Sequence, residues 1–257
     1  MKSDVAKDLP LKIEDEICKS LVMSSTQSNL YKSAISDYEH QKQIREQMGD
    51  KAGAMMLGLL HRLKMICAHP TSVLQGTNSL ESSPKLKWLK NQLDSIKLKN
   101  EKVIIFTELK DIQRDLQFTI LDAYGFMPKI INGDTNSSSE KGVSRQKLID
   151  EFQLEPGFGV IILSTSAVGF GVNVQAANHV IHFTRPWNPA KEDQATDRAY
   201  RIGQTKDVYV YYPTVVSEAF DSFEKKLDGL LSRKRELAGD MLNGYDEISV
   251  HDLVDVE

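Results

Sequence analysis

The sequence is poor in cysteine, in net charge and in long apolar runs. Its 257 residues include only two cysteines, Cys18 and Cys67, which excludes a disulfide framework and favours a reducing compartment. The net charge is -4 at pH 7, so no overall field draws the chain to nucleic acid and any phosphate binding must come from local clusters. No apolar run approaches a membrane span, and the first ten residues lack the apolar core of a signal peptide. We therefore expect an intracellular protein without a membrane partner.

Two motifs of a complete nucleoside-triphosphatase are also missing. The sequence has no Gly-x-x-x-x-Gly-Lys-Ser/Thr loop, whose backbone would cradle phosphates. No acidic pair follows an expected strand to hold magnesium, because the run Glu14-Asp15-Glu16 precedes an expected helix. The chain therefore has at most half of a nucleotide-hydrolysing site. His61, Cys67 and His69 do not have the spacing of a zinc site, and we expect no bound metal there.

Short β-branched runs alternate with helical segments over residues 76–216. Continuous apolar strands that alternate with helices predict a parallel sheet covered on both faces, so we expect a doubly wound α/β domain. The expected strands are 103–107, 129–131, 160–164, 180–183 and 208–212, and the expected helices are about 85–98, 109–124, 140–154 and 190–202.

The flanking regions are expected to be helical. Residues 1–75 predict helices, with a polar helix over 25–48 and a more apolar one over 52–67 that together form a hairpin. Apolar side chains recur at three- and four-residue steps from Ser217 to Leu242, which predicts a helix laid across its own domain, with a short coiled coil as the alternative. The basic residues of this helix are typical of a solvated face, although they also suit a phosphate backbone or an acidic partner.

The stretch from Ser164 to Val174 directly follows one expected strand. In open α/β sheets, ligands bind beyond the carboxyl ends of the strands. Gly169 and Gly171 would permit close approach to the backbone, while Ser164 and Thr165 supply hydroxyl groups. A turn that simply needs flexible residues has the same composition, so a ligand site and a plain turn both remain open.

The most informative stretch runs from Gln194 to Gln204. On a continuous helix, spacings of three and four residues place Gln194, Arg198 and Arg201 on one face, beside a stripe of small apolar residues that suits a buried side. A pair of guanidinium groups matches the oxygens of a phosphate chain. The sequence therefore predicts a helix that grips a nucleotide.

A loop with the sequence Arg185-Pro-Trp-Asn-Pro189 comes directly before this helix. Asn188 is a favourable N-cap and Pro189 suits the first helical turn, so the helix is expected to begin sharply. Trp187 lies in an otherwise polar loop. Its ring is equally consistent with a half-buried anchor for the loop and with a stacking contact to nucleic acid.

These motifs together resemble the C-terminal RecA-like lobe of a superfamily-two helicase-like ATPase of the Swi/Snf type. The resemblance covers nearly the whole chain, and the combination of Trp187-Asn-Pro189 with Arg201-Ile-Gly-Gln204 is highly specific to that family. The matching segments are Leu9-Pro-Leu-Lys12, Ser25-Thr-Gln27, Leu30-Tyr31, Leu63 to Pro70, Ser83-Pro-Lys-Leu86, Val103 to Glu108, Asn132-Gly-Asp134, Arg145 to Phe152, Ser164 to Val174 and Gln194 to Gln204. Val168, Lys64 and Thr184 depart from the glycine, arginine and aspartate that are common in the family.

The resemblance implies roles for individual residues. Arg198 and Arg201 would be arginine fingers that reach a triphosphate held by an N-terminal RecA-like lobe of the same protein. ATP and Mg²⁺ would be held mainly by that lobe, with Gly169, Gly171 and Gln194 on the ATP side of this one. The residues that would face double-stranded DNA are Ser164, Thr165, Trp187, Thr107 and Lys110. Residues 25–67 resemble the family's second-lobe protrusion, and residues 217–242 resemble its brace.

The resulting expectation is the second motor lobe of an ATP-dependent translocase of double-stranded DNA, inactive as an ATPase by itself. Its expected parts are residues 1–75, 76–216 and 217–257. It would work in the cytoplasm or nucleoid of a bacterial or viral system, or in a eukaryotic nucleus. The alternatives are a non-catalytic adaptor lobe that docks on a partner motor or on DNA, and a small-molecule nucleotide-binding domain built on the Gly-x-Gly turn. The sequence leaves the oligomeric state open.

Overall fold

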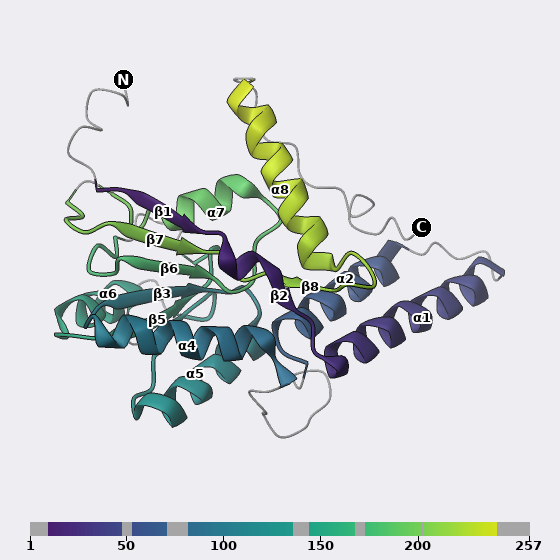
Figure 1. Ribbon diagram of the computed structural model, residues 1–257, viewed down its shortest axis with the longest axis horizontal. Coiled ribbons are helices and arrows are strands. Elements are labelled where there is room, and N and C mark those ends of the chain that lie inside the picture. Colours follow the sequence, from purple (N-terminus) through teal and green to yellow (C-terminus); the bar gives the residue numbers. More distant parts are fainter. Residues whose placement is uncertain are drawn as a thin grey trace. The chain divides into compact units, whose positions relative to one another are not determined.

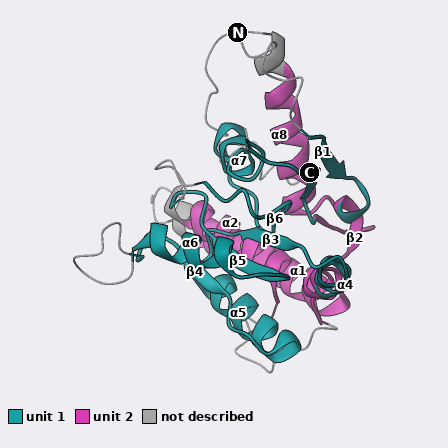
Figure 2. Ribbon diagram, turned by 90° about the vertical axis from the view of Figure 1, so that its left-hand side faces the viewer, with its two compact units in different colours: residues 1–18, 90–213 teal, residues 19–89, 214–257 magenta. Residues whose placement is uncertain are grey.

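The computed structural model describes residues 10–47, 53–70, 82–135, 144–167, 173–201 and 203–240. The chain divides into two compact units (Figure 2). Unit 1 consists of residues 1–18 and 90–213, and unit 2 consists of residues 19–89 and 214–257. The first residues of the chain are grouped with unit 1 because a strand among residues 10–18 belongs to its sheet.

A six-stranded parallel sheet forms the centre of unit 1 (Figure 1). The strands lie in the order β1-β7-β6-β3-β5-β4, and each neighbouring pair is parallel. Their bounds are Lys12–Asp15 for β1, Lys102–Phe106 for β3, Lys129–Ile131 for β4, Gly159–Leu163 for β5, His179–His182 for β6 and Val208–Tyr211 for β7. After β3 the chain forms β4 and β5 on one side of β3 in the strand order, and it then forms β6 and β7 on the other side. This reversal confirms the predicted doubly wound fold.

The middle of this sheet is buried and mainly apolar. Every residue of β3 and of β5 is buried, and Ile104 and Ile161 are fully inaccessible. A strand buried on both faces requires a continuous run of β-branched residues, which is why these strands could be recognised in the sequence. Each of the five expected strands is present within one residue of its predicted bounds.

Helices follow the strands of unit 1. The helix α5 (Lys110–Tyr124) packs against β4, and α6 (Arg145–Leu154) packs against β5. The hydroxyl of Ser144 caps the start of α6 by accepting from the Lys147 amide, while α5 ends at Gly125, whose φ of 76° is in the left-handed region that glycine favours. The helix α4 (Pro84–Leu98) crosses the division between the two units.

The expectation that residues 1–75 are all helical is wrong for β1. Residues Lys12–Asp15 pair with Val208–Tyr211 in parallel register, and the Val208 amide donates to the Leu11 carbonyl at 2.8 Å. This strand lies at the edge of the sheet and is exposed on both faces. It therefore lacks the buried apolar run that identified the other strands, and its partner lies almost two hundred residues away in the sequence.

Unit 2 contains a helical hairpin, a short two-stranded sheet and a long helix. The helices α1 (Ser25–Gln47) and α2 (Gly53–Ala68) pack together as the sequence predicted. The strands β2 (Leu21–Val22) and β8 (Val215–Val216) are parallel and were not predicted. The helix α8 runs over Phe223–Asp240 and begins six residues later than expected, because Ser222 caps its first turn by accepting from the Lys225 amide at 3.2 Å.

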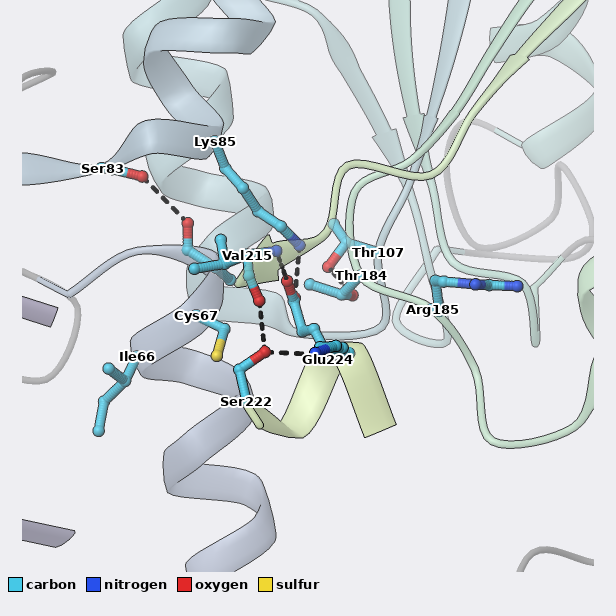
Figure 3. A network of polar contacts seen from close by, with 12 residues as sticks. Ile66, Cys67, Ser83, Lys85, Thr107, Thr184, Arg185, Val215, Ser222 and Glu224 are labelled. Carbon is cyan, nitrogen blue, oxygen red and sulfur yellow. Dashed lines mark hydrogen bonds and ion pairs between the residues drawn. The ribbon is translucent and has the colours of Figure 1, made fainter. Parts of the chain in front are cut away.

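A buried ion pair joins the start of α4 to the start of α8 within unit 2 (Figure 3). The Lys85 Nζ lies 2.5 Å from one carboxylate oxygen of Glu224, and the other oxygen accepts from the Val215 amide at 2.9 Å. The Lys85 side chain is 1% exposed and that of Glu224 is 9% exposed. Burial, followed by the nearby Glu224 carboxylate, raises the pKa of the Cys67 thiol. Cys67 is thus an inert core residue.

A second charged cluster lies at the amino ends of the central strands in unit 1. The Glu101 carboxylate accepts from His179 Nε2 at 2.8 Å and from Lys206 Nζ at 3.0 Å. Burial favours a raised pKa for Glu101, but the hydrogen bonds from His179, Lys206 and Asn178 outweigh it and lower the pKa to about 2. Burial also lowers the pKa of His179, whose Nδ1 accepts from the Tyr211 hydroxyl at 3.1 Å when Nε2 carries the proton.

We expect Glu101→Gln to destabilise unit 1 most above pH 4.5. A depressed carboxyl pKa contributes stability that is fully present above its ordinary value of 4.5 and is lost as pH falls toward about 2. The variant should therefore be about 1.5–3 kcal/mol less stable than the parent at pH 7, the range for a hydrogen bond to a charged group. Denaturant unfolding at pH 7 and pH 3 would show this gap narrowing. The exposed Asp122→Asn should show no comparable gap, and a gap for Glu101→Gln that is constant with pH would contradict the assignment.

Candidate nucleotide and nucleic-acid interface

Hydroxyl groups collect at the carboxyl edge of the sheet in unit 1. Thr107 follows β3, Ser164 follows β5 and Thr184 follows β6, and because the strands are parallel these positions lie along one edge. The Thr107 and Thr184 hydroxyls are 2.7 Å apart (Figure 3). All three side chains are buried. The structure therefore places Thr107 and Ser164, two predicted DNA-facing residues, in an inner layer of this edge.

The segment Ser164–Ala167 forms a turn that is joined to the residue after Thr107. The Ala167 amide donates to the Ser164 hydroxyl at 3.2 Å. The Thr165 hydroxyl donates to the Glu108 carboxylate, and the Ser166 amide donates to the same carboxylate at 3.0 Å. We call residues 164–167 the hydroxyl turn. Thr165 is half-buried and Ser166 is exposed, so this turn is the accessible layer of the edge.

Lys110 lies at the start of α5 and has an acidic partner. Its Nζ is 2.8 Å from one carboxylate oxygen of Asp134 and 2.7 Å from the other, in a pair that is more than half exposed. The Asn132 Oδ1 accepts from the backbone amide of Asp134 at 2.9 Å, and the Asn132 Nδ2 donates to the Gln113 Oε1 at 2.7 Å. The predicted Lys110 is therefore at the surface of the same edge, beyond β3 and β4.

The predicted arginine helix is shorter than expected. The helix α7 covers Pro189–Thr196, and residues 197–201 continue as turns. The Arg198 amide donates to the Ala195 carbonyl at 3.1 Å, three residues back, and the Arg198 carbonyl accepts from the Val174 amide at 3.1 Å. The bond from Val174 fixes this turn to another segment of the chain. The continuous helix on which the spacing of Gln194, Arg198 and Arg201 rested thus ends at Thr196, before both arginines.

The two arginines differ in their exposure to solvent. Arg201 is exposed, as is Gln194, whereas Arg198 is half-buried. Within the described part of the chain, the Arg198 Nε is buried and has no hydrogen-bond partner, and the same holds for the Asn173 Oδ1. A buried guanidinium nitrogen without a partner is costly, so this position is suited to an acceptor from outside the chain.

Gln204 fixes the end of this region, a role that the sequence did not reveal. Its side-chain Nε2 donates to the backbone carbonyls of Gln175 and Ala177, each at 3.0 Å, and to that of Ala199 at 3.2 Å. The preceding Gly203 has a φ of 102°, and an added Cβ there would lie 2.8 Å from the Gln175 side chain. Glycine and glutamine at these positions therefore shape the turn that carries Arg201. Only spatial contacts could have shown this.

The loop that carries Trp187 is held by a buried ion pair. The Arg185 guanidinium contacts both carboxylate oxygens of Glu192, at 2.8 and 2.7 Å, and lies over the Tyr212 ring with its centre 4.4 Å away. Asn188 caps α7 as predicted, accepting from the Ala190 amide at 2.9 Å. Trp187 is half-buried, which is consistent both with an anchor for the loop and with a contact to nucleic acid.

Several residues considered in the sequence are not among those described above. Gly169 and Gly171 lie outside the described residues. His61 is exposed whereas Cys67 and His69 are buried. Among the residues that the structure describes, no group of three or more His, Cys, Asp or Glu side chains is placed to hold a metal ion. No helix in the described ranges is long and apolar enough to cross a membrane.

Comparison with known proteins agrees with this architecture. Residues 84–203 match the family described as the helicase conserved C-terminal domain. The structure is similar to the Sulfolobus solfataricus SWI2/SNF2 ATPase C-terminal domain, with a TM-score of 0.69 at 26% identity over 96% of this chain and 99% of that one. It is equally similar to the ATPase core of that protein in complex with double-stranded DNA, with a TM-score of 0.69 at 30% identity over 93% of this chain and 47% of that one.

Two curated relatives align with nearly the whole chain. The Zorya protein ZorD of Escherichia coli O139:H28 is 60% identical over 249 residues, which are 96% of this chain and 23% of ZorD. The putative ATP-dependent helicase/translocase YwqA of Bacillus subtilis is 34% identical over 257 residues, covering 97% of this chain and 26% of YwqA. The chain thus spans about a quarter of the length of these relatives.

The parallel sheet and its matched helicase domain define a RecA-like lobe of the helicase type. Within that class, the chain belongs to the Swi2/Snf2 family of helicase-like ATPases and corresponds to their C-terminal RecA-like lobe.

Proposed function

We propose that this chain is the second motor lobe of an ATP-dependent translocase of double-stranded DNA. One observation carries the proposal: the Val174 amide donates to the Arg198 carbonyl at 3.1 Å. This bond ties the segment that follows the hydroxyl turn to the turn that bears Arg198 and Arg201. In this proposal, the contact would help to pass a movement at the nucleotide to the groups suited to a phosphate backbone.

The nucleotide side of this proposal rests on the two arginines. Arg201 is exposed and Arg198 has a buried Nε without a partner in the described chain, so both suit the oxygens of a triphosphate. Gln194 is exposed nearby in the sequence, and Gly169 and Gly171 would complete the ATP side. ATP and Mg²⁺ would be held mainly by an N-terminal RecA-like lobe, for which the greater length of the relatives leaves room.

The nucleic-acid side rests on the carboxyl edge of the sheet. Thr165, Lys110 and Trp187 are accessible there, and they supply a hydroxyl, a cation and a ring, the groups that bind phosphates and stack on bases. Ser164 and Thr107 support them from the inner layer. A related ATPase core has been solved in complex with double-stranded DNA. In this proposal α1 and α2 form the protrusion of the lobe, and α8 forms its brace.

The test compares the 257-residue chain with the full-length protein that contains it. The full-length protein should hydrolyse ATP faster when duplex DNA is added, whereas the chain alone should bind duplex DNA without measurable turnover. DNA-stimulated hydrolysis of ATP by the chain alone would disprove the proposal that this chain supplies only half of the ATP-hydrolysing site. A full-length protein that binds DNA but never hydrolyses ATP would instead favour a non-catalytic adaptor lobe.

A further inference from the structure

The Glu108 carboxylate is surrounded by donors from the hydroxyl turn. It accepts from the Thr165 hydroxyl, from the Ser166 amide at 3.0 Å and from the Ser166 hydroxyl at 3.0 Å. Two of these bonds converge on Oε1 and the third reaches Oε2. Glu108 and Thr165 are separated by 57 residues in the sequence and belong to segments that follow the neighbouring strands β3 and β5.

Three converging neutral donors form a site for an anion. A carboxylate and a phosphodiester present similar oxygens, and hydrogen bonds from hydroxyl and amide groups to either are strengthened by the charge. The turn is accessible, since Ser166 is exposed while Thr165 and Glu108 are only half-buried. An external phosphate could therefore reach the donors that Glu108 now occupies.

We infer that Glu108 is an internal substitute for a DNA phosphate, which fills the anion site of the hydroxyl turn until duplex DNA displaces it. This inference rests on the proposed function, because it takes the hydroxyl turn as a contact for the DNA backbone. While the site is empty of DNA, the carboxylate satisfies the donors and keeps the turn in shape. When DNA binds, the carboxylate must leave, both because its donors are taken and because its charge repels the phosphate.

Lys110, two residues after Glu108, is also paired within the chain, but in a weaker contact. Its ammonium is paired with Asp134, and both side chains are more than half exposed. An exposed pair of this kind costs little to break, so Lys110 is readily released to a phosphate. The carboxyl edge thus has two acidic side chains on groups that suit DNA, and Glu108 is the one held by three donors.

The competing account is that Glu108 only fixes the shape of the turn that binds DNA. The two accounts predict opposite effects of removing the carboxylate. Removal of a competitor strengthens DNA binding, whereas removal of a positioning group weakens it. Duplex-DNA affinity is therefore the measurement that separates them.

The experiment measures binding of a fluorescently labelled DNA duplex to the 257-residue chain by anisotropy. Glu108→Ala should bind about tenfold more tightly, equivalent to about 1.4 kcal/mol. Asp111→Ala is the matched control, because it removes one exposed carboxylate from the first turn of α5 and changes the net charge equally. It should change affinity less than about twofold. The difference between the two variants should persist when salt is raised, since the released donors are neutral.

Three results are distinguishable. Tighter binding by Glu108→Ala than by Asp111→Ala supports the inference. Unchanged or weaker binding by Glu108→Ala, with the parent chain still binding DNA, overturns the inference and leaves the proposed function intact. Absence of DNA binding by every variant at low salt overturns both. If Glu108→Ala fails to fold, Glu108→Gln takes its place, because it removes the charge and one acceptor oxygen and should give a smaller gain in the same direction.

Discussion

Replacing Arg201 with alanine in the full-length protein should leave ATP binding nearly intact and lower ATP turnover on the order of 10³-fold or more. Arg201 is exposed on a turn whose shape is set by Gly203 and Gln204, so its removal should disturb little of the fold. An arginine that meets the triphosphate only as charge develops stabilises the transition state and contributes little to ground-state affinity. Nucleotide affinity by calorimetry and turnover with duplex DNA would separate the two effects.

Two matched variants sharpen this test. Arg201→Lys keeps the charge but loses the planar fork, and should recover only a small part of the activity. Arg114→Ala removes an equally charged, exposed side chain from α5, where its partner Asp111 is 3.5 Å away, and should leave turnover unchanged. If Arg201→Ala retained the turnover of Arg114→Ala, Arg201 would not be an arginine finger.

Arg185→Ala should cost about 3–5 kcal/mol of unfolding free energy, the range for removing one partner of a buried ion pair. Glu192 is fully buried, so the substitution leaves its carboxylate without the two guanidinium contacts at 2.7 and 2.8 Å. The substitution also removes the guanidinium from the Tyr212 ring. The midpoint of thermal unfolding should fall by about 6–20 °C, and calorimetry or denaturant unfolding of the 257-residue chain would measure the loss.

The double substitution Arg185→Met with Glu192→Leu is the informative control. Removing both charges leaves no unpaired carboxylate, so the double variant should recover most of the lost stability. Arg114→Ala, which breaks an exposed pair, should cost less than about 1 kcal/mol. A double variant as unstable as Arg185→Ala would mean that the guanidinium contributes through packing and not through its pairing with Glu192.

The sequence predicted the sheet of unit 1 well because its signals are local. The strands β3 and β5 each contain the run Val-Ile-Ile, and Asn188-Pro189 is a cap signal that acts within a few residues. The edge strand β1 was missed, since an exposed strand has no buried run to reveal it. The resemblance to Swi/Snf-type ATPases identified the family from the same local motifs.

The candidate site was predicted only in composition. The sequence placed Gln194, Arg198 and Arg201 on one helix, but the Val174 amide takes the Arg198 carbonyl and the helix ends at Thr196. It named Thr165 as a DNA contact, but not the Glu108 carboxylate that holds its hydroxyl. Both contacts join segments that are distant in the sequence, which a local pattern does not reveal.

The parallel sheet, the family and the types of side chain at the carboxyl edge could all be predicted from the amino-acid sequence. These follow from periodicity, strand composition and motif spacing, all of which act over a few residues. Which groups contact each other became visible in the folded chain: Glu108 with the hydroxyl turn, Arg185 with Glu192, and the Arg198 turn with Val174. The reason is physical, since a hydrogen bond depends on distances of about 3 Å between atoms that the fold brings together.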